Sequence, residues 1–238
     1  MDKLDLIEKI PLTNHEKEVY RTLRTNVEFT GVENQTIAIT SCTPDDGKTT
    51  VSFNLARAFA DNDKKTLYID ADLRKSVFIQ RYDVKGNPKG LSHYLAGQMA
   101  LKDIIYKTNK ERLFVIPVGM FPSNPTELFN KERFSQLLEE LKTIFDYIVV
   151  DTPPLGSVVD AAIIANKCDA SILTVTSDKC SRSFVKSVLA QLKTANPNCL
   201  GVVLNKVDLK KNSYYTKKYG GRYGKKYGYY SSYYGHTE

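Results

Sequence analysis

The stretch from Ile37 to Thr50, which reads IAITSCTPDDGKTT, constrains this chain more than any other. Mostly apolar, β-favouring residues lead into a turn-rich loop that ends in Gly47, Lys48 and Thr49, and a helix-compatible run, VSFNLARAFA, follows. A strand, a loop ending in Gly-Lys-Thr and a helix form the order of a P-loop. In such a loop the backbone N–H groups converge on phosphate oxygens. The stretch therefore predicts a nucleotide site.

Each residue at the end of this loop has a chemical role. Gly47 lets the backbone approach the ligand, Lys48 reaches the β- and γ-phosphates as a point charge, and the Thr49 hydroxyl binds Mg²⁺. Asp46 and Thr50 flank these three residues. We include all five among the predicted nucleotide-binding residues.

Two features depart from the full P-loop pattern. Cys42 stands where a Gly is expected, and the Asp45–Asp46 pair places two carboxylates where a phosphate approaches. These carboxylates either point outward or weaken nucleotide binding. An ordinary βα turn with a chance Gly-Lys-Thr remains the plainer interpretation of the loop.

Length and composition favour one α/β domain with appendages. The chain has 238 residues and a hydrophobic content of 42%, enough for a sizeable core. No apolar run approaches the roughly 20 residues that span a bilayer, and the amino-terminal MDKLDLIEKIPL has no apolar signal-peptide core. The four cysteines lack metal-ligand spacing. We therefore expect a cytoplasmic protein.

Strand-like and helix-like segments alternate along the chain, which predicts a mostly parallel sheet with helices on both faces. Asn14 is the predicted cap of the first helix, and Asn124 opens a helix whose apolar stripe runs to Leu141. The predicted strands cover residues 37–40, 66–69, 113–116, 147–150, 170–175 and 200–204. The predicted helices cover residues 12–29, 51–60, 90–95, 124–141, 159–165 and 184–194.

Acidic residues follow two of the predicted strands. Asp70 and Asp72, with Arg74, come directly after residues 66–69, and Asp151 follows residues 147–150. Open α/β sheets bind their ligands at the carboxyl ends of the strands, so we expect these carboxylates to lie beside the P-loop. Such groups hold Mg²⁺ or accept a proton from an attacking hydroxyl. A polar loop and an ordinary strand end are the alternatives.

The last predicted strand is followed by Asn205-Lys206-Val207-Asp208, which matches the N-K-x-D pattern of GTPases. Against a GTPase, Asp151 is followed by Thr-Pro-Pro where D-x-x-G is required, and the D-x-D-x-R element at Asp70 has no place in that family. We predict that Asn205 contacts the base and leave the identity of the base open.

Residues 209–238 form a basic, tyrosine-rich tail. They carry seven Lys or Arg and one acidic residue, whereas the rest of the chain carries 27 basic and 26 acidic residues. Apart from Leu209 and the tyrosine rings the tail has no apolar residues, so it cannot form a packed core. We therefore expect the tail to be disordered. Three roles stay open: single-stranded nucleic-acid binding by stacking, a sticky low-complexity segment, or an array of phospho-acceptors. Each phosphate adds a charge of about −1.5 to −2. The predicted acceptors are nine of the chain's 15 tyrosines: Tyr214, Tyr215, Tyr219, Tyr223, Tyr227, Tyr229, Tyr230, Tyr233 and Tyr234.

In the first predicted helix, Glu18, Arg21 and Arg24 lie three residues apart and fan over one side. A solvated charged face is one interpretation, and a complementary patch for another subunit is the other.

Together these motifs resemble the bacterial tyrosine autokinases (BY-kinases) of capsular and exopolysaccharide biosynthesis, most closely the Gram-positive form with a separate membrane adaptor. The resemblance covers nearly the whole chain. The matching features are the interface motif Glu18-x-x-Arg21-x-x-Arg24, the P-loop ending at 47–50, the extra acidic motif at 67–74, the second acidic strand at 147–154 and the tyrosine tail.

The resemblance implies an ATP- and Mg²⁺-dependent protein-tyrosine kinase on a deviant-Walker P-loop fold. It would autophosphorylate its tyrosine cluster in trans and regulate polysaccharide biosynthesis and chain length. In this family Lys48 contacts the phosphates, Thr49 binds Mg²⁺ directly, Asp72 and Asp151 organise the Mg²⁺ shell, and Asp70 takes the tyrosine proton.

The resemblance also implies an organisation and a set of partners. Residues 1–35 form a helical segment with the oligomerisation motif, 36–208 the kinase domain and 209–238 the autophosphorylation tail. The expected partners are further copies in a ring, a transmembrane chain-length adaptor whose cytoplasmic segment activates the kinase at the inner face of the membrane, and a cognate tyrosine phosphatase. No nucleic acid is expected.

Two other functions compete with the kinase. One is a partition- or septum-type ATPase that switches between monomer and dimer, although such ATPases carry an extra lysine where this chain has Thr43. The other is a non-enzymatic nucleic-acid-binding module that uses the basic aromatic tail.

Overall fold

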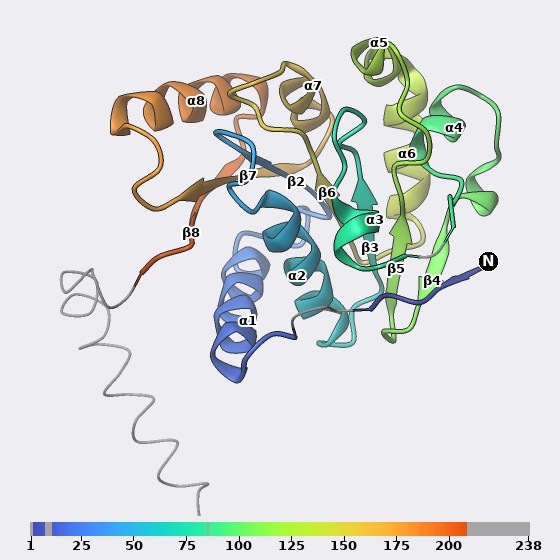
Figure 1. The fold of residues 1–238 in the computed structure, drawn as a ribbon, viewed down its shortest axis with the longest axis horizontal. Helices are drawn as coiled ribbons and strands as arrows, with labels where there is room; N and C mark the ends of the chain where they lie inside the picture. The colour runs from blue at the N-terminus through green and yellow to red at the C-terminus, as the bar shows by residue number, and fades with distance from the viewer. Residues whose placement is uncertain (1, 8–10, 85, 209–238) are drawn as a thin grey trace, which may run out of the picture.

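The computed structural model describes residues 2–7, 11–84 and 86–208, which form a sheet with helices on both faces (Figure 1). The strands are β1 Lys3–Leu4, β2 Thr36–Ser41, β3 Thr66–Asp70, β4 Tyr106–Thr108, β5 Leu113–Ile116, β6 Tyr147–Asp151, β7 Ala170–Thr176 and β8 Cys199–Asn205. The helices are α1 Asn14–Glu28, α2 Lys48–Ala60, α3 Phe78–Arg81, α4 Leu91–Leu95, α5 Pro125–Asn130, α6 Glu132–Lys142, α7 Asp160–Asn166 and α8 Arg182–Ala195, with a 3₁₀ turn, η1, at Leu101–Asp103.

The sheet has eight strands in the order β1-β4-β5-β3-β6-β2-β7-β8. All neighbouring pairs are parallel except β4 with β5, which confirms the predicted, mostly parallel sheet. The edge strands β1 and β4 were not predicted, because two or three residues are too few to display a pattern. The chain runs from β2 to β3 on one side of the sheet and from β6 to β7 on the other. The strand order therefore reverses between β6 and β2, and open α/β sheets bind their ligands at such a reversal.

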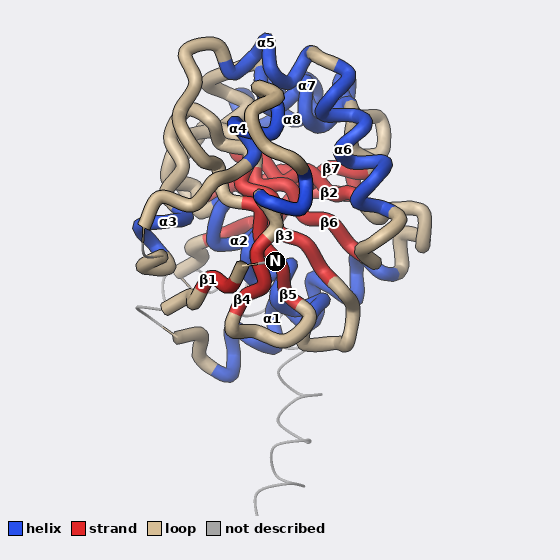
Figure 2. The backbone as a smooth tube through the Cα atoms, turned by 90° about the vertical axis from the view of Figure 1, so that its right-hand side faces the viewer, coloured by secondary structure: helices blue, strands red, loops and turns tan. Residues whose placement is uncertain are grey.

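Two layers of helices cover the two faces of the sheet (Figure 2). Side chains alternate between the faces along each central strand: Ile37 and Ile39 of β2 join the core under α1, α2 and α3, whereas Ala38 joins the core under α4 to α8. This period of two explains why the central strands are apolar throughout, since both faces are buried.

Two predicted helix boundaries were wrong. The first helix is capped by Thr13 and not by Asn14: the Thr13 hydroxyl accepts from the backbone N–H of Glu16, whose side chain bonds back to Thr13. The helix predicted over 124–141 is two helices, because Lys131 takes an extended conformation (ψ 150°) between α5 and α6. Among the described residues, none of the helices has both the length and the apolar character needed to cross a bilayer.

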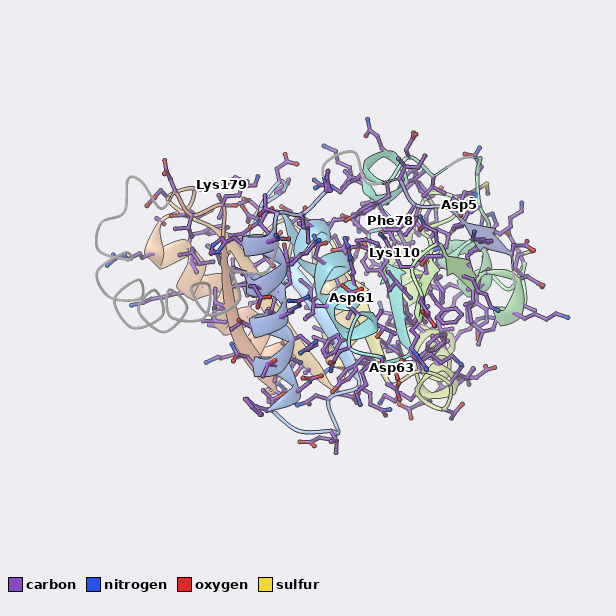
Figure 3. All side chains as sticks on the ribbon, turned by 90° about the horizontal axis from the view of Figure 1, so that it is seen from below. Asp5, Asp61, Asp63, Phe78, Lys110 and Lys179 are labelled. Atoms are coloured by element: carbon purple, nitrogen blue, oxygen red, sulfur yellow. The ribbon has the colours of Figure 1, made fainter. Side chains whose placement is uncertain are left out.

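An aromatic cluster fastens α3 to α2 and so fixes the loop that follows Asp72. The ring centroid of Phe53 on α2 lies 5.4 Å from those of Tyr68 and Phe78 and 4.2 Å from that of Tyr82. Phe53 and Phe78 are almost completely buried, and Phe78 lies in the interior of the molecule (Figure 3). Edge-to-face and tilted aromatic pairs of this kind add stabilisation beyond the area that they bury.

We therefore expect Phe53→Ala to lower the free energy of unfolding by about 3–5 kcal/mol, because it leaves a cavity among rings that cannot close around it. Urea unfolding followed by circular dichroism measures this change. Phe29→Ala is the matched control: Phe29 is 83% exposed, and its loss should change the free energy by less than about 0.5 kcal/mol. Equal losses in the two variants would contradict the assignment of the cluster as core.

Candidate active site

The P-loop turns sharply at Gly47, which is the N-cap of α2. Gly47 has φ 87° and Asp45 has φ 62°, both in the left-handed region that favours glycine. A Cβ at residue 47 would lie 2.1 Å from the amide nitrogen of Asn205, so only glycine fits there. Cys42, where the pattern expects glycine, is buried in the core, and burial raises the pKa of its thiol to about 11. Cys42 is therefore a packing residue and not a nucleophile.

The predicted acids converge beside the P-loop lysine. Asp70 and Asp151 are register partners at the carboxyl ends of the adjacent strands β3 and β6. The Lys48 ammonium lies 2.8 Å from Asp72 Oδ2 and 3.9 Å from Asp151 Oδ1. All four side chains are buried. The structure therefore brings together the residues that the sequence predicted for one site.

Burial and mutual repulsion change the protonation of this cluster. Burial and, after it, the neighbouring Asp151 carboxylate raise the pKa of Asp70 to about 8, against the hydrogen bond from Ser76 and the charge of Lys48, which lower it. Burial alone would lower the pKa of Lys48, but the charges of Asp151 and Asp72 outweigh it, and the pKa is raised. The site therefore holds a permanent cation beside a carboxyl group whose pKa lies close to neutrality.

Two residues of the cluster were not predicted from the sequence. The Tyr68 hydroxyl donates to Asp151 Oδ2 at 3.0 Å, and burial raises its pKa well above the ordinary value, so it remains a donor. The Ser76 hydroxyl donates to Asp70 Oδ2. Asp70 itself is fully buried and does not line the pocket. Neither partner has a sequence signature, because the Tyr68 bond joins two strands that are distant in the sequence and the Ser76 bond depends on the fold of the loop after β3.

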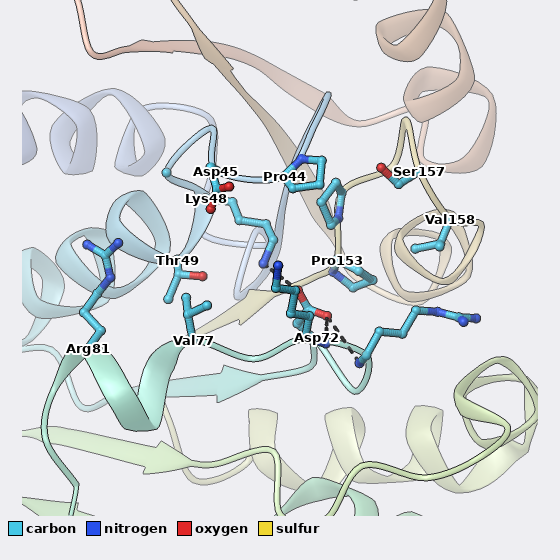
Figure 4. Close-up of a pocket in the computed structure, with 14 residues that line it drawn as sticks. Pro44, Asp45, Lys48, Thr49, Asp72, Val77, Arg81, Pro153, Ser157 and Val158 are labelled. Atoms are coloured by element: carbon cyan, nitrogen blue, oxygen red, sulfur yellow. Dashed lines mark hydrogen bonds and ion pairs between the residues drawn. The ribbon is translucent and has the colours of Figure 1, made fainter.

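A pocket of about 190 Å³ opens above this cluster (Figure 4). The Lys48 side chain extends along it toward Asp72, and the P-loop residues Pro44 and Asp45 form part of its rim. The remaining lining residues are Gly47, Thr49, Asp72, Arg74, Lys75, Val77, Arg81, Pro153, Pro154, Ser157 and Val158. Cationic side chains around a P-loop suit an anionic ligand.

The third residue of the D-x-D-x-R element forms part of the pocket frame. Arg74 makes two hydrogen bonds with Asp160, Nε to Oδ2 at 2.6 Å and Nη2 to Oδ1 at 3.1 Å. The Thr126 hydroxyl donates to the same Asp160 at 2.6 Å. Asp160 is buried at the start of α7, so this planar, two-bond contact ties the loop after β3 to the opposite helix layer.

The donors of the site fit a magnesium ion. Asp151 Oδ1 is buried and accepts no hydrogen bond from the described residues; the Lys48 ammonium at 3.9 Å is its charged neighbour. Asp72 and the Thr49 hydroxyl lie on the same pocket. Carboxylate and hydroxyl oxygens are the hard ligands that Mg²⁺ prefers, with phosphate and water oxygens completing its shell. In the described part of the chain, no three His, Cys, Asp or Glu side chains form a cluster that could hold a metal ion.

The two adjacent aspartates of the P-loop lie in different environments. Asp45 is exposed at the pocket rim, whereas Asp46 is 1% exposed and its carboxylate accepts from the backbone N–H of Thr43 and from Lys179. Asp46 does not line the pocket. Of the two possibilities for these carboxylates, pointing outward or weakening nucleotide binding, Asp46 therefore agrees with the first. The Thr50 hydroxyl accepts from Arg81 at 2.7 Å.

Other predicted residues lie away from the pocket. The amide nitrogen of Asn205 donates to the Asp46 carbonyl at 2.9 Å, and its contact with a base remains a prediction. On α1, Glu18 and Arg21 form an exposed ion pair, but Arg24 turns toward its own chain and donates to the Ala58 carbonyl at 3.3 Å. The predicted phospho-acceptor tyrosines lie outside the described residues.

Comparisons with known proteins agree on one family. Residues 34–201 match a family described as an AAA domain. Tyrosine-protein kinase CpsD of Streptococcus agalactiae is 42% identical over 215 residues, which cover 90% of this chain and 93% of the relative. The solved kinase domain of the Escherichia coli tyrosine kinase ETK has a TM-score of 0.75 at 37% identity and covers 81% of this chain and 77% of that chain.

The septum site-determining protein MinD from Pyrococcus horikoshii, solved with Mg-ADP, is less similar. Its TM-score is 0.62 at 27% identity, covering 71% of this chain and 69% of that chain. The kinase interpretation is therefore confirmed over the septum-type alternative. The chain has the P-loop and the buried acids, and its relatives match it over nearly its full length. It therefore belongs to the family of bacterial tyrosine-protein kinases.

Proposed function

We propose that this chain transfers the γ-phosphoryl group of ATP to tyrosine hydroxyls, first of all those of its own tail at 209–238. The observation that supports this most is the buried cluster of Lys48 with Asp70, Asp72 and Asp151 beneath a pocket formed by the P-loop. In this cluster Lys48 is the cation for phosphate, and Asp70 is a carboxyl group whose pKa lies near neutrality and which can accept a proton. Phosphoryl transfer needs little more than such positioning and charge stabilisation.

In the proposed reaction the tyrosine oxygen forms a bond to the γ-phosphorus while the bond from that phosphorus to the β,γ-bridging oxygen breaks. ADP leaves, and the phenolic proton passes to the Asp70 carboxylate. Asp70 suits this role because its pKa of about 8 makes it a stronger base than an ordinary aspartate. Since the Ser76 hydroxyl covers Asp70 Oδ2, the tyrosine hydroxyl either displaces that hydrogen bond or passes its proton through Ser76.

Thr49, Asp72 and Asp151 would hold Mg²⁺, which would supply positive charge to offset the negative charge that develops on the phosphates. Lys48 lies between Asp72 and Asp151 and would turn from these carboxylates to the phosphates as ATP binds. Both sets of partners are anionic, so the ammonium keeps a counter-charge throughout.

The proposed setting is capsular or extracellular polysaccharide biosynthesis, in which the phosphorylation state of the tail regulates chain length. The charge of the tail supports a switch: it carries +6, and three or four phosphates of about −1.5 to −2 each would cancel it. The proposed partners are the cytoplasmic segment of a transmembrane adaptor, further copies in a ring that contact the α1 motif, and a cognate tyrosine phosphatase.

Replacing the proposed base separates chemistry from binding. We expect Asp70→Asn, which keeps the shape of the side chain, to lower the rate of tail phosphorylation by about 10²–10⁴-fold. The affinity for ATP should change by less than about threefold, because Asp70 lies beneath the phosphate-binding surface. Phosphotyrosine blotting and equilibrium binding of ATP measure the two quantities. Asp61→Asn, an exposed surface change, is the control. A rate in Asp70→Asn within tenfold of the unsubstituted chain would rule out the proposed role.

Transfer between chains is tested by mixing two variants. Lys48→Met keeps the tail but lacks the phosphate-binding lysine, and a chain with Phe at all nine tail tyrosines keeps the site but lacks acceptors. We expect phosphotyrosine on the Lys48→Met chain only in the mixture, at a rate that rises with the concentration of the other chain. The variants incubated singly are the controls. A tail that stays unmodified in the mixture, while the unsubstituted chain is phosphorylated, would show that transfer occurs within one chain.

A further inference from the structure

Three consecutive carbonyl groups of the P-loop accept hydrogen bonds from the ends of β7 and β8. The Lys179 ammonium donates to the Pro44 carbonyl, and the Lys206 ammonium donates to the Asp45 carbonyl at 2.7 Å. The Asn205 amide donates to the Asp46 carbonyl at 2.9 Å. None of the three donors lines the pocket.

These contacts fix the direction of the N–H groups on the other side of the loop. In a trans peptide the carbonyl of one residue and the N–H of the next point in opposite directions. Carbonyls of residues 44–46 that point toward Lys179, Lys206 and Asn205 therefore turn the N–H groups of residues 45–47 toward the pocket. Converging N–H groups make an anion-binding concavity.

Lys179 has a second contact that closes the loop. Its ammonium lies 3.0 Å from Oδ1 of the buried Asp46, whose Oδ2 accepts from the backbone N–H of Thr43 at 2.7 Å. Lys179 lies beyond the end of β7 and is partly exposed, at 36% of its side chain (Figure 3). Without this cation a buried carboxylate would stand uncompensated inside the phosphate loop, which is costly.

We propose that Lys179 and Lys206 are positioning residues for the nucleotide: they hold the peptide groups of the P-loop in the orientation that binds phosphate. The inference rests on the proposed function, because it assumes that phosphate binds at this loop. It explains the aspartate at position 46, whose carboxylate pairs with the Lys179 ammonium and accepts from the Thr43 N–H within the loop. It also gives Asn205 and Lys206 of the N-K-x-D sequence a role that does not involve a base.

Binding of phosphate-containing probes tests this role. ADP and inorganic pyrophosphate are titrated into the full chain, the latter by competition with a fluorescent ADP. We expect Lys179→Met to raise the dissociation constants for ADP and for pyrophosphate by the same factor of about ten. The reason is that the lost contact orients the part of the loop that binds phosphate. Lys206→Met should act in the same direction by about threefold, since it is exposed and contacts one carbonyl. Lys179→Arg, which keeps the charge and donors, should restore affinity to within about threefold.

Lys186→Met, on the exposed part of α8, is the matched control and should leave both constants unchanged. Thermal unfolding without nucleotide separates positioning from general destabilisation. We expect Lys179→Met to melt below the control, because the buried Asp46 loses its counter-charge, and binding is therefore compared at a temperature at which both variants are fully folded. Dissociation constants within twofold of the unsubstituted chain in both Lys179→Met and Lys206→Met would overturn the inference and leave the proposed function intact. A lower melting temperature with unchanged binding would overturn it too. An unsubstituted chain that binds neither probe would overturn the proposed function, and the inference with it.

Discussion

The ion pair between Lys48 and Asp72 is the interaction on which the site depends. Three carboxylates, those of Asp70, Asp72 and Asp151, are buried within reach of one ammonium group, and the sheet register places two of them side by side. Lys48 offsets only part of the negative charge of this cluster, and burial together with the repulsion that remains raises the pKa of Asp70. A divalent cation that arrives with a phosphate ligand would supply positive charge where the carboxylates are in excess.

The surrounding fold supplies the rigidity that this cluster requires. The aromatic cluster around Phe53 holds α3 against α2, and the Arg74–Asp160 contact joins the same loop to the helices on the opposite face. The loop that carries Asp72 is thus fixed from both layers, and the P-loop is fixed from the ends of β7 and β8. The pocket lies between two loops that are each held by groups outside it, which is how a preorganised phosphate site is built.

The sequence predicted the central strands and the charged centre because both have local signals. Asp70, Asp72 and Asp151 each follow an apolar strand, and Lys48 follows a loop with a recognisable pattern. The Thr13 cap also had a signal, a Thr with Glu three residues later, which was overlooked in favour of Asn14. Lys179 could not be found in this way: it lies 135 residues from the carbonyl it contacts, and only the tertiary fold joins them. The break at Lys131 also lacked a signal, because the sequence there is compatible with a continuous helix.

The contact between Gly47 and Asn205 has a consequence for where this domain ends. Asn205 is the last residue of β8, yet its amide lies against the glycine that opens α2, and Lys206 beyond it contacts the same loop. The final turn of the described chain therefore packs against the P-loop and is more than a spacer before the tyrosines. A shortened protein made to remove the tail would have to keep residues 205 and 206. A cut directly after Asn205 would leave the strands complete but would remove the Lys206 contact with the P-loop.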